Sequence, residues 1–251
     1  MRRNARRSFA VGLIWMGSCL PIAVTPAGAQ QKLSLEVTVP APTLPSDLFK
    51  PNGQPTEFIG VGLGQKIDDI RKILTAQNLA NEDSSARFLL DEEYYAVEII
   101  ATGPNRFPTY IIWSGPDDPV EKQSVRVEFS SPLSGQRSTN VRRFVTYKGA
   151  GGPSVGTLRK AIIDKYGPPS TDNKTKMIWL WAHDQLVRSG AYDKQMTIAM
   201  QAKADVVSDV VYDLVDGEAR DKDRDRINEF QKSVEDAAKK VRDQHAAAPK
   251  L

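Results

Sequence analysis

The order of the predicted elements occurs twice along the chain, and this repetition constrains the fold more than any other feature. Residues 58–74 predict a short strand, a glycine-rich turn and a helix, and residues 141–162 predict the same order. The two helices align without a gap, with residues 67–74 over residues 155–162. We therefore predict an α+β protein with two repeated units, each a short helix packed on an antiparallel sheet.

Extended segments follow both helices. They are predicted at residues 86–90, 94–102, 107–113 and 123–130 after the first helix, and at 177–182, 195–201 and 206–215 after the second. In the segment 123–130, Val125 and Val127 alternate with Arg126 and Glu128, as in a strand with one buried face. We place the first unit at residues 57–135 and the second at 136–215.

Residues 1–29 predict a cleaved export signal. Four arginines precede an apolar run over residues 9–24, and Ala27-Gly28-Ala29 follows as a cleavage site. The run is too short for a lasting membrane span, so we expect a periplasmic or secreted protein. Residues 16–19 also resemble a lipobox, which leaves a lipid anchor through Cys19 as an alternative. Arg6-Arg7 leaves the choice between general and twin-arginine export open.

The composition after the signal excludes several classes of function. The chain has 34 basic and 31 acidic residues, and four of the basic ones but none of the acidic ones lie in the signal. The mature balance of −1 does not favour nucleic acid as a partner. Cys19 is the only cysteine, so the mature chain has no disulfide and no cysteine-ligated metal.

Two flanking segments differ from the repeated units. Residues 30–56 contain five prolines, which predicts a Pro-rich linker. Apolar residues alternate with polar ones over residues 33–39, which leaves a short edge strand there as an alternative. Residues 216–251 predict a long charged amphipathic helix and a C-terminal tail, because an apolar stripe recurs at helical spacing. That stripe consists of Ile227, Phe230, Val234 and Val241, with Ala237 between them. We expect it to pack either on the protein's own sheet or on a helix of another chain.

Three tryptophans are candidate binding residues. Trp113, Trp179 and Trp181 lie in predicted strands, and Trp179 and Trp181 share one face because they are two residues apart. If a helix covers that face, they belong to the core. If it is open, they form a binding surface of the kind that protein partners favour.

Catalytic and metal-binding patterns are incomplete. The glycines at residues 60–64 lack the spacing of a phosphate-binding loop, and His183 has no serine-elbow motif to accompany it. Asp221, Asp223 and Asp225 have the opening spacing of a calcium loop but lack its glycine and its final glutamate, which favours a solvated helix face. We therefore predict no catalytic residues, no metal and no cofactor.

The second unit resembles a known group of proteins. Its glycine-rich turn, its helix ending in KYGPPS (residues 165–170) and its MIWLW strand (residues 177–181) resemble the repeat of the β-lactamase-inhibitory-protein-like fold. The helix-plus-sheet module of the small lipoprotein of the outer-membrane β-barrel assembly machine is similar. The resemblance implies helices on one face of an antiparallel sheet whose other face can hold a protein. This chain lacks the cysteines of the inhibitor.

These observations lead to one expected function and two alternatives. We expect an exported, non-enzymatic protein-interaction module of the bacterial cell envelope with a protein partner. The first alternative is a carboxylate-dependent cell-envelope hydrolase that uses Asp91, Glu92 or Glu93. The second is a carrier of a small apolar ligand.

Overall fold

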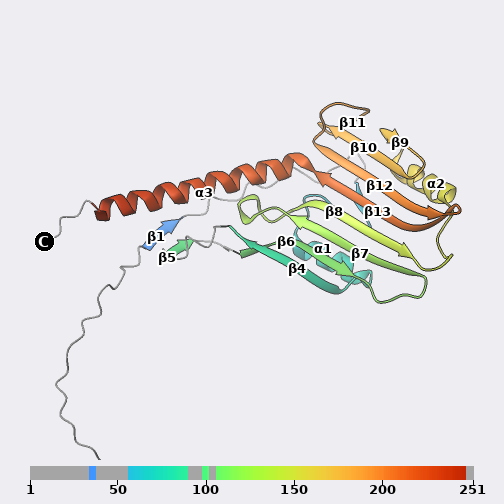
Figure 1. The fold of residues 1–251 in the computed structure, drawn as a ribbon, viewed down its shortest axis with the longest axis horizontal. Helices are drawn as coiled ribbons and strands as arrows, with labels where there is room; N and C mark the ends of the chain where they lie inside the picture. The colour runs from blue at the N-terminus through green and yellow to red at the C-terminus, as the bar shows by residue number, and fades with distance from the viewer. Residues whose placement is uncertain (1–33, 38–55, 90–97, 102–105, 247–251) are drawn as a thin grey trace, which may run out of the picture. The chain divides into compact units, whose positions relative to one another are not determined.

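A computed structural model describes residues 34–37, 56–89, 98–101 and 106–246, all of which belong to one unit, Leu33–Leu251. The predicted export signal and most of the predicted linker lie outside these residues. Three helices, a short 3₁₀ helix and thirteen strands are described. In chain order they are β1 (Ser34–Val37), β2 (Glu57–Phe58), β3 (Val61–Gly62), α1 (Ile67–Ala76), β4 (Asn81–Phe88), β5 (Glu98–Ala101), β6 (Arg106–Ser114), β7 (Glu121–Phe129), η3 (Pro132–Ser134), β8 (Ser138–Tyr147), α2 (Val155–Tyr166), β9 (Thr171–Asp172), β10 (Lys176–Ala182), β11 (Gln185–Val187), β12 (Lys194–Lys203), β13 (Val206–Asp216) and α3 (Gly217–Ala246) (Figure 1).

One large sheet organises these elements. Its strands are ordered β11-β10-β12-β13-β8-β7-β6-β4, β9 pairs with the remaining length of β10, and every pairing within it is antiparallel. Two small sheets are not paired with its strands, the parallel pair β1–β5 and the hairpin β2–β3. The predicted α+β class with a mostly antiparallel sheet is confirmed.

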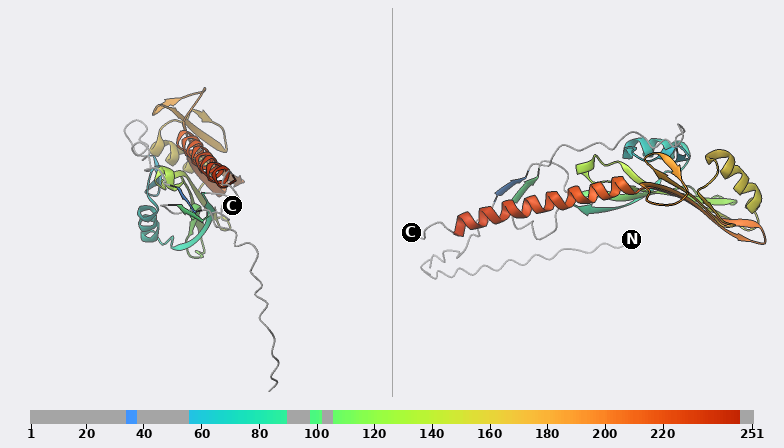
Figure 2. Two further views of the ribbon diagram at one scale, coloured as in Figure 1. Left: turned by 90° about the vertical axis from the view of Figure 1, so that its left-hand side faces the viewer. Right: turned by 90° about the horizontal axis from the view of Figure 1, so that it is seen from above.

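Both short helices cover the same face of this sheet (Figure 2). Ile70 and Leu74 of α1 and Val155 and Ile162 of α2 are buried in a single cluster with alternate residues of the strands. Their spacings of four and seven residues place each pair on one side of its helix. Burying each of these aliphatic side chains contributes about 1.5–3 kcal/mol, so the helices hold the sheet from one side.

The strands agree with the sequence predictions in the middle of the chain and differ at the edges. β4 begins five residues before the predicted segment 86–90, because its polar sequence NEDSSARF carries no apolar alternation. The short strands β9 and β11 were not predicted. β1 lies inside the segment 30–56, where the sequence left a short edge strand open beside the favoured linker, and residues 34–37 form a strand.

The predicted C-terminal helix is confirmed as α3, which follows β13 without a loop. The carboxylate of Asp216 accepts a hydrogen bond from the Ala219 amide at 2.8 Å, and thereby satisfies a free N–H of the first turn. Gly217 fits here because a Cβ atom would lie 3.2 Å from the carbonyl oxygen of Asp193. None of the described helices is long and apolar enough to cross a membrane.

Candidate functional site

A groove of about 540 Å³ lies between the first turns of α3 and the ends of β6, β7 and β8. Thr109, Glu128 and Thr139 come from these three strands, and Arg220 comes from the first turns of α3. Arg87 of the edge strand β4 adds a further charged side chain. Elements distant in sequence therefore meet around one hollow, which makes it the first candidate for a binding site among the described residues.

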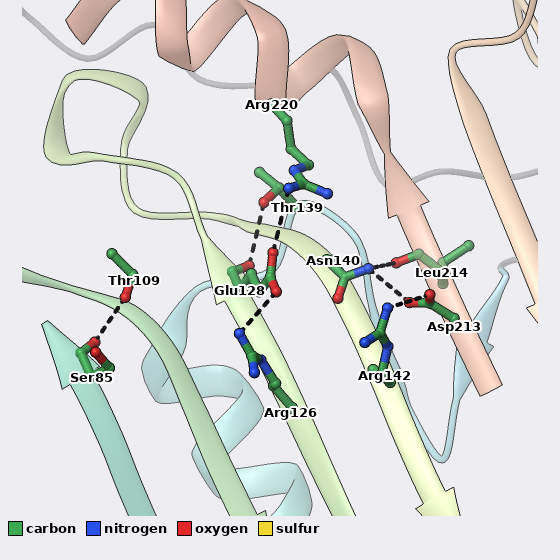
Figure 3. A network of polar contacts seen from close by, with 10 residues as sticks. All are labelled: Ser85, Thr109, Arg126, Glu128, Thr139, Asn140, Arg142, Asp213, Leu214 and Arg220. Atoms are coloured by element: carbon green, nitrogen blue, oxygen red, sulfur yellow. Dashed lines mark hydrogen bonds and ion pairs between the residues drawn. The ribbon is translucent and has the colours of Figure 1, made fainter. Parts of the chain in front are cut away.

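Two β-bulges shape the floor of this groove. β4 and β6 change register so that Thr109 has no opposite residue, and β7 and β8 change register so that Thr139 has none. The Thr109 hydroxyl donates to the Ser85 carbonyl at 3.1 Å, and the Thr139 hydroxyl donates to the Glu128 carbonyl at 3.5 Å (Figure 3). Bulges redirect side chains and are frequent beside functional sites. Here they flank Glu128 on both sides.

The bulge in β6 also changes which layer its side chains join. Ile111 and Trp113 belong to the core beneath α1 and α2, whereas Phe107, beyond the bulge, packs with α3. An extra residue inverts the alternation of a strand, so Phe107 is placed on the side that α3 occupies. Its neighbours in this second cluster are Leu89, Leu133, Phe230, Val234 and Ala238.

The predicted partner-helix stripe therefore packs on the protein's own chain over part of its length. Phe230 and Val234 are buried in the second cluster, and Ile227 packs against it half-buried. The side chain of Val241 lies outside the described residues. Of the two partners that the sequence left open, the structure places the protein's own strand β6 and 3₁₀ helix η3 against these residues.

Asp223 fastens α3 to the loop after β7. Only 5% of Asp223 is exposed, and its carboxylate accepts hydrogen bonds from the Ser131 amide at 2.9 Å and the Ser131 hydroxyl at 2.5 Å. The interpretation of this aspartate as part of a solvated helix face is wrong. A signal for it exists in the sequence, since Asp223 stands one turn before Ile227 on the same stripe.

Two arginines, Arg126 of β7 and Arg142 of β8, lie directly opposite each other next to the groove. Like charges at such a pair are unfavourable unless they are compensated. Arg126 bonds to Glu128 at 3.2 Å, and its guanidinium lies 3.9 Å from the centre of the Tyr110 ring. Arg142 bonds to Asp213 at 2.7 Å (Figure 3), and this bond raises the pKa of the Arg142 guanidinium, so it stays charged.

The three candidate tryptophans are buried in the core, one of the two placements that the sequence left open. Trp113, Trp179 and Trp181 are exposed by 1%, 0% and 2%. The Trp113 indole donates to Glu82 at 3.1 Å, and the Trp179 indole donates to the Gly167 carbonyl at 3.2 Å. Because α1 and α2 cover the face that these rings occupy, none of them is presented to a partner in this structure.

The other candidate residues do not meet at a second site. Asp91, Glu92 and Glu93 lie outside the described residues. His183 is exposed in the turn after β10, where its amide donates to Asp193. Within the described ranges, no cluster of three or more histidine, cysteine, aspartate or glutamate side chains could hold a metal ion.

Comparisons with known proteins assign no relative to this chain. No family model, no curated protein and no solved structure matches it. The residues and their geometry therefore carry the functional argument.

Proposed function

We propose that this protein is an exported, non-enzymatic protein-interaction module of the bacterial cell envelope. In this proposal it contacts its protein partner through the open face of the sheet, meaning the face opposite α1 and α2, and through the groove beside α3. The export signal predicted from the first 29 residues supports the location. The role is supported by the resemblance, predicted from the sequence, to inhibitory and assembly proteins that hold a protein partner on a sheet.

The main observation that supports binding through the open face is a row of apolar side chains across it. Ala199 lies opposite Val211, and Val211 lies opposite Phe144, so three neighbouring strands present these side chains together. Phe144 is 36% exposed although it sits in the centre of the sheet. On β10, Ile178 and Leu180 face the same side because they alternate with the buried tryptophans, and they lie opposite Thr197 and Gln195, beside the row. Apolar and aromatic side chains of this kind form the centre of protein interfaces.

Photo-crosslinking in cells tests this proposal. A photoreactive phenylalanine analogue replaces Phe144 on the open face or, as the matched control, Ala161 on the exposed side of α2. We expect a discrete crosslinked protein from position 144 and none from position 161. Equal crosslinking from both positions, or none from position 144 in a folded and exported protein, would reject binding through this face.

The groove beside α3 supports a polar contact and does not favour an apolar-ligand carrier. Three arginines and three carboxylates contribute to its lining, namely Arg87, Arg220, Arg224, Glu128, Asp221 and Asp223. An apolar ligand would remove these charges from water without replacing their hydrogen bonds, at a cost in free energy. A segment of a protein with polar side chains fits this lining better.

We also infer that the sheet arose from two repeated units, and several contacts support this. α1 precedes β4, β6, β7 and β8, and α2 precedes β9, β10, β12 and β13, with β8 and β13 paired at the centre. Arg71 of α1 bonds to Glu82 of β4 at 2.9 Å, and the aligned Arg159 of α2 bonds to Asp172 of β9 at 2.6 Å. On this inference, β8 belongs to the first unit, and the boundary falls after Tyr147 instead of after residue 135.

The entries to the two helices support the same inference. The residue before each helix forms an isolated bridge with the start of the last strand of its unit. Lys66 bridges Arg137, just before β8, and Ser154 bridges Val206, the first residue of β13. A matching contact at both helix entries is expected if one ancestral unit was duplicated.

A further inference from the structure

The groove beside α3 contains more arginine hydrogen-bond donors than its own carboxylates use. Arg224 bonds to Asp221 at 2.8 Å, and the buried Asp223 is occupied by two hydrogen bonds from Ser131. These two carboxylates are therefore already paired. Glu128 is the one remaining acidic side chain among the described residues that line the groove.

Glu128 does not satisfy the remaining cations. One of its oxygens accepts a hydrogen bond from Arg126 at 3.2 Å, and the other lies 3.8 Å from Arg220 (Figure 3). The second distance is too long for a hydrogen bond, so the guanidinium of Arg220 keeps its donors available. Half of the Arg220 side chain is exposed.

Arg87 brings a second guanidinium to the groove from the edge strand. Its guanidinium carbon lies 5.2 Å from the centre of the Phe107 ring, a cation–π contact that provides no hydrogen-bond acceptor oxygen. Within the ranges that the structure describes, Arg87 forms no ion pair. The backbone of Gly217 at the start of α3 also lines the groove, and the positive end of the helix dipole adds to the potential there.

We propose that Arg87 and Arg220 together bind a carboxylate, so that the groove recognises an acidic segment of the protein partner. This inference rests on the proposed protein-binding function and names the chemistry of one contact. A planar carboxylate accepts the paired N–H donors of a guanidinium, which makes it the complement of two arginines that lack such an acceptor. Thr109 and Thr139 also line the groove, but their hydroxyl groups already donate to the Ser85 and Glu128 carbonyls, so the arginines are the donors in this proposal.

Binding of labelled peptides to the purified mature protein tests the inference. One peptide carries several glutamates spaced by glycine and serine, and the matched peptide carries glutamine at each of those places. We expect fluorescence anisotropy to show binding of the glutamate peptide and at least about tenfold weaker binding of the glutamine peptide, as loss of a charged hydrogen bond requires. Binding should weaken with added salt. Equal binding of the two peptides, or no binding of the glutamate peptide, would overturn the inference.

Variants of the protein locate the contact. Arg87→Gln and Arg220→Gln should each weaken binding of the glutamate peptide about tenfold, and Arg220→Lys should weaken it less because the charge is kept. Arg188→Gln is the matched control, since Arg188 is exposed and does not line the groove. If the double variant R87Q/R220Q, folded by circular dichroism, binds as tightly as R188Q does, the carboxylate inference fails.

The two experiments distinguish failure of the carboxylate inference from failure of the proposed binding through the open face. Crosslinking at Phe144 with no effect of the arginine variants would reject carboxylate recognition and leave protein binding in place. Absence of any crosslinked protein at Phe144, with glutamate-specific peptide binding that depends on Arg87 and Arg220, would reject binding through the open face and keep the groove.

Discussion

The two halves of the sheet share their internal contacts and differ in what surrounds them. The first half consists of α1 with β4, β6, β7 and β8, and the second half consists of α2 with β9, β10, β12 and β13. In each half an arginine of the helix forms an ion pair with a carboxylate of an outer strand, Arg71 with Glu82 and Arg159 with Asp172. Each half also buries tryptophan under its helix. The first half has the bulges at Thr109 and Thr139 and buries Phe107 in the cluster with α3, whereas the second half has one register shift, at Ser208, and contributes no residue to that cluster.

This difference teaches where a specific site arises on a regular scaffold. Antiparallel pairing and a covering helix make both halves stable but leave them alike. Two extra residues in β6 and β8 turn side chains toward α3, and the groove forms where that packing ends. On the open face, the first half displays Arg126, Glu128 and Arg142 beside the apolar Phe144, and the second half displays apolar residues such as Ile178 and Leu180 beside the charged Asp213.

The largest expected effect comes from removing one buried tryptophan from each half. Trp113→Ala and Trp179→Ala should each lower the free energy of unfolding by about 3–5 kcal/mol, since both leave a large cavity in a common core. Urea unfolding should show one transition in both variants. Leu186→Ala, at a side chain that is 37% exposed, is the control and should have little effect. Separate transitions for the two halves would contradict a shared core.

A smaller effect should separate the halves through α3. Asp223→Asn removes the buried charge that binds Ser131 and should cost about 1–3 kcal/mol. Hydrogen exchange should increase in α3 and η3 while the second half keeps its protection. Asp225→Asn, two residues further along α3 and exposed, is the matched control. Equal exchange in the two variants would show that this carboxylate does not hold the helix.

The paired arginines allow a direct comparison of the halves. Arg71→Gln and Arg159→Gln should each reduce stability by about 0.2–1 kcal/mol, because partly exposed ion pairs contribute little. Thermal unfolding of the two single variants and of the double variant measures both effects. Similar, additive losses would sharpen the inference of repeated units. A large loss in one half alone would weaken it.

The smallest expected effect concerns pH at the junction of β13 and α3. Burial raises the pKa of the Asp216 carboxyl above its ordinary value of 3.8, against the opposing hydrogen bond from Ala219. A raised folded-state pKa means that its contribution to stability is full below pH 3.8 and is lost as the pH rises through the folded-state pKa.

Asp216→Asn tests this sign, because asparagine keeps the helix cap and cannot ionise. The variant should be at least as stable as the natural protein at neutral pH and should lose less stability between acidic and neutral pH. Denaturation at a series of pH values measures the difference. If the variant is less stable than the natural protein above pH 3.8 and equally stable below it, the pKa of Asp216 is lowered by folding and the prediction is wrong.

The sequence predicted the central elements well and the candidate site poorly. Alternation in β7 and helical spacing in α1, α2 and α3 are local patterns, and the described elements follow them within a few residues. β4 was predicted too short because a polar edge strand carries no such pattern. Arg87 and Arg220 were not predicted as binding residues, since nothing local distinguishes them from other exposed arginines.

By itself, the amino-acid sequence determined the α+β class, the antiparallel strands and the long charged helix, because hydrophobic periodicity acts between near neighbours in the chain. Only the tertiary structure decided that the tryptophans are buried, that Phe107 joins α3 and that Asp223 holds Ser131. These outcomes depend on strand register and on the two bulges, which join residues far apart in sequence and leave no periodic signal.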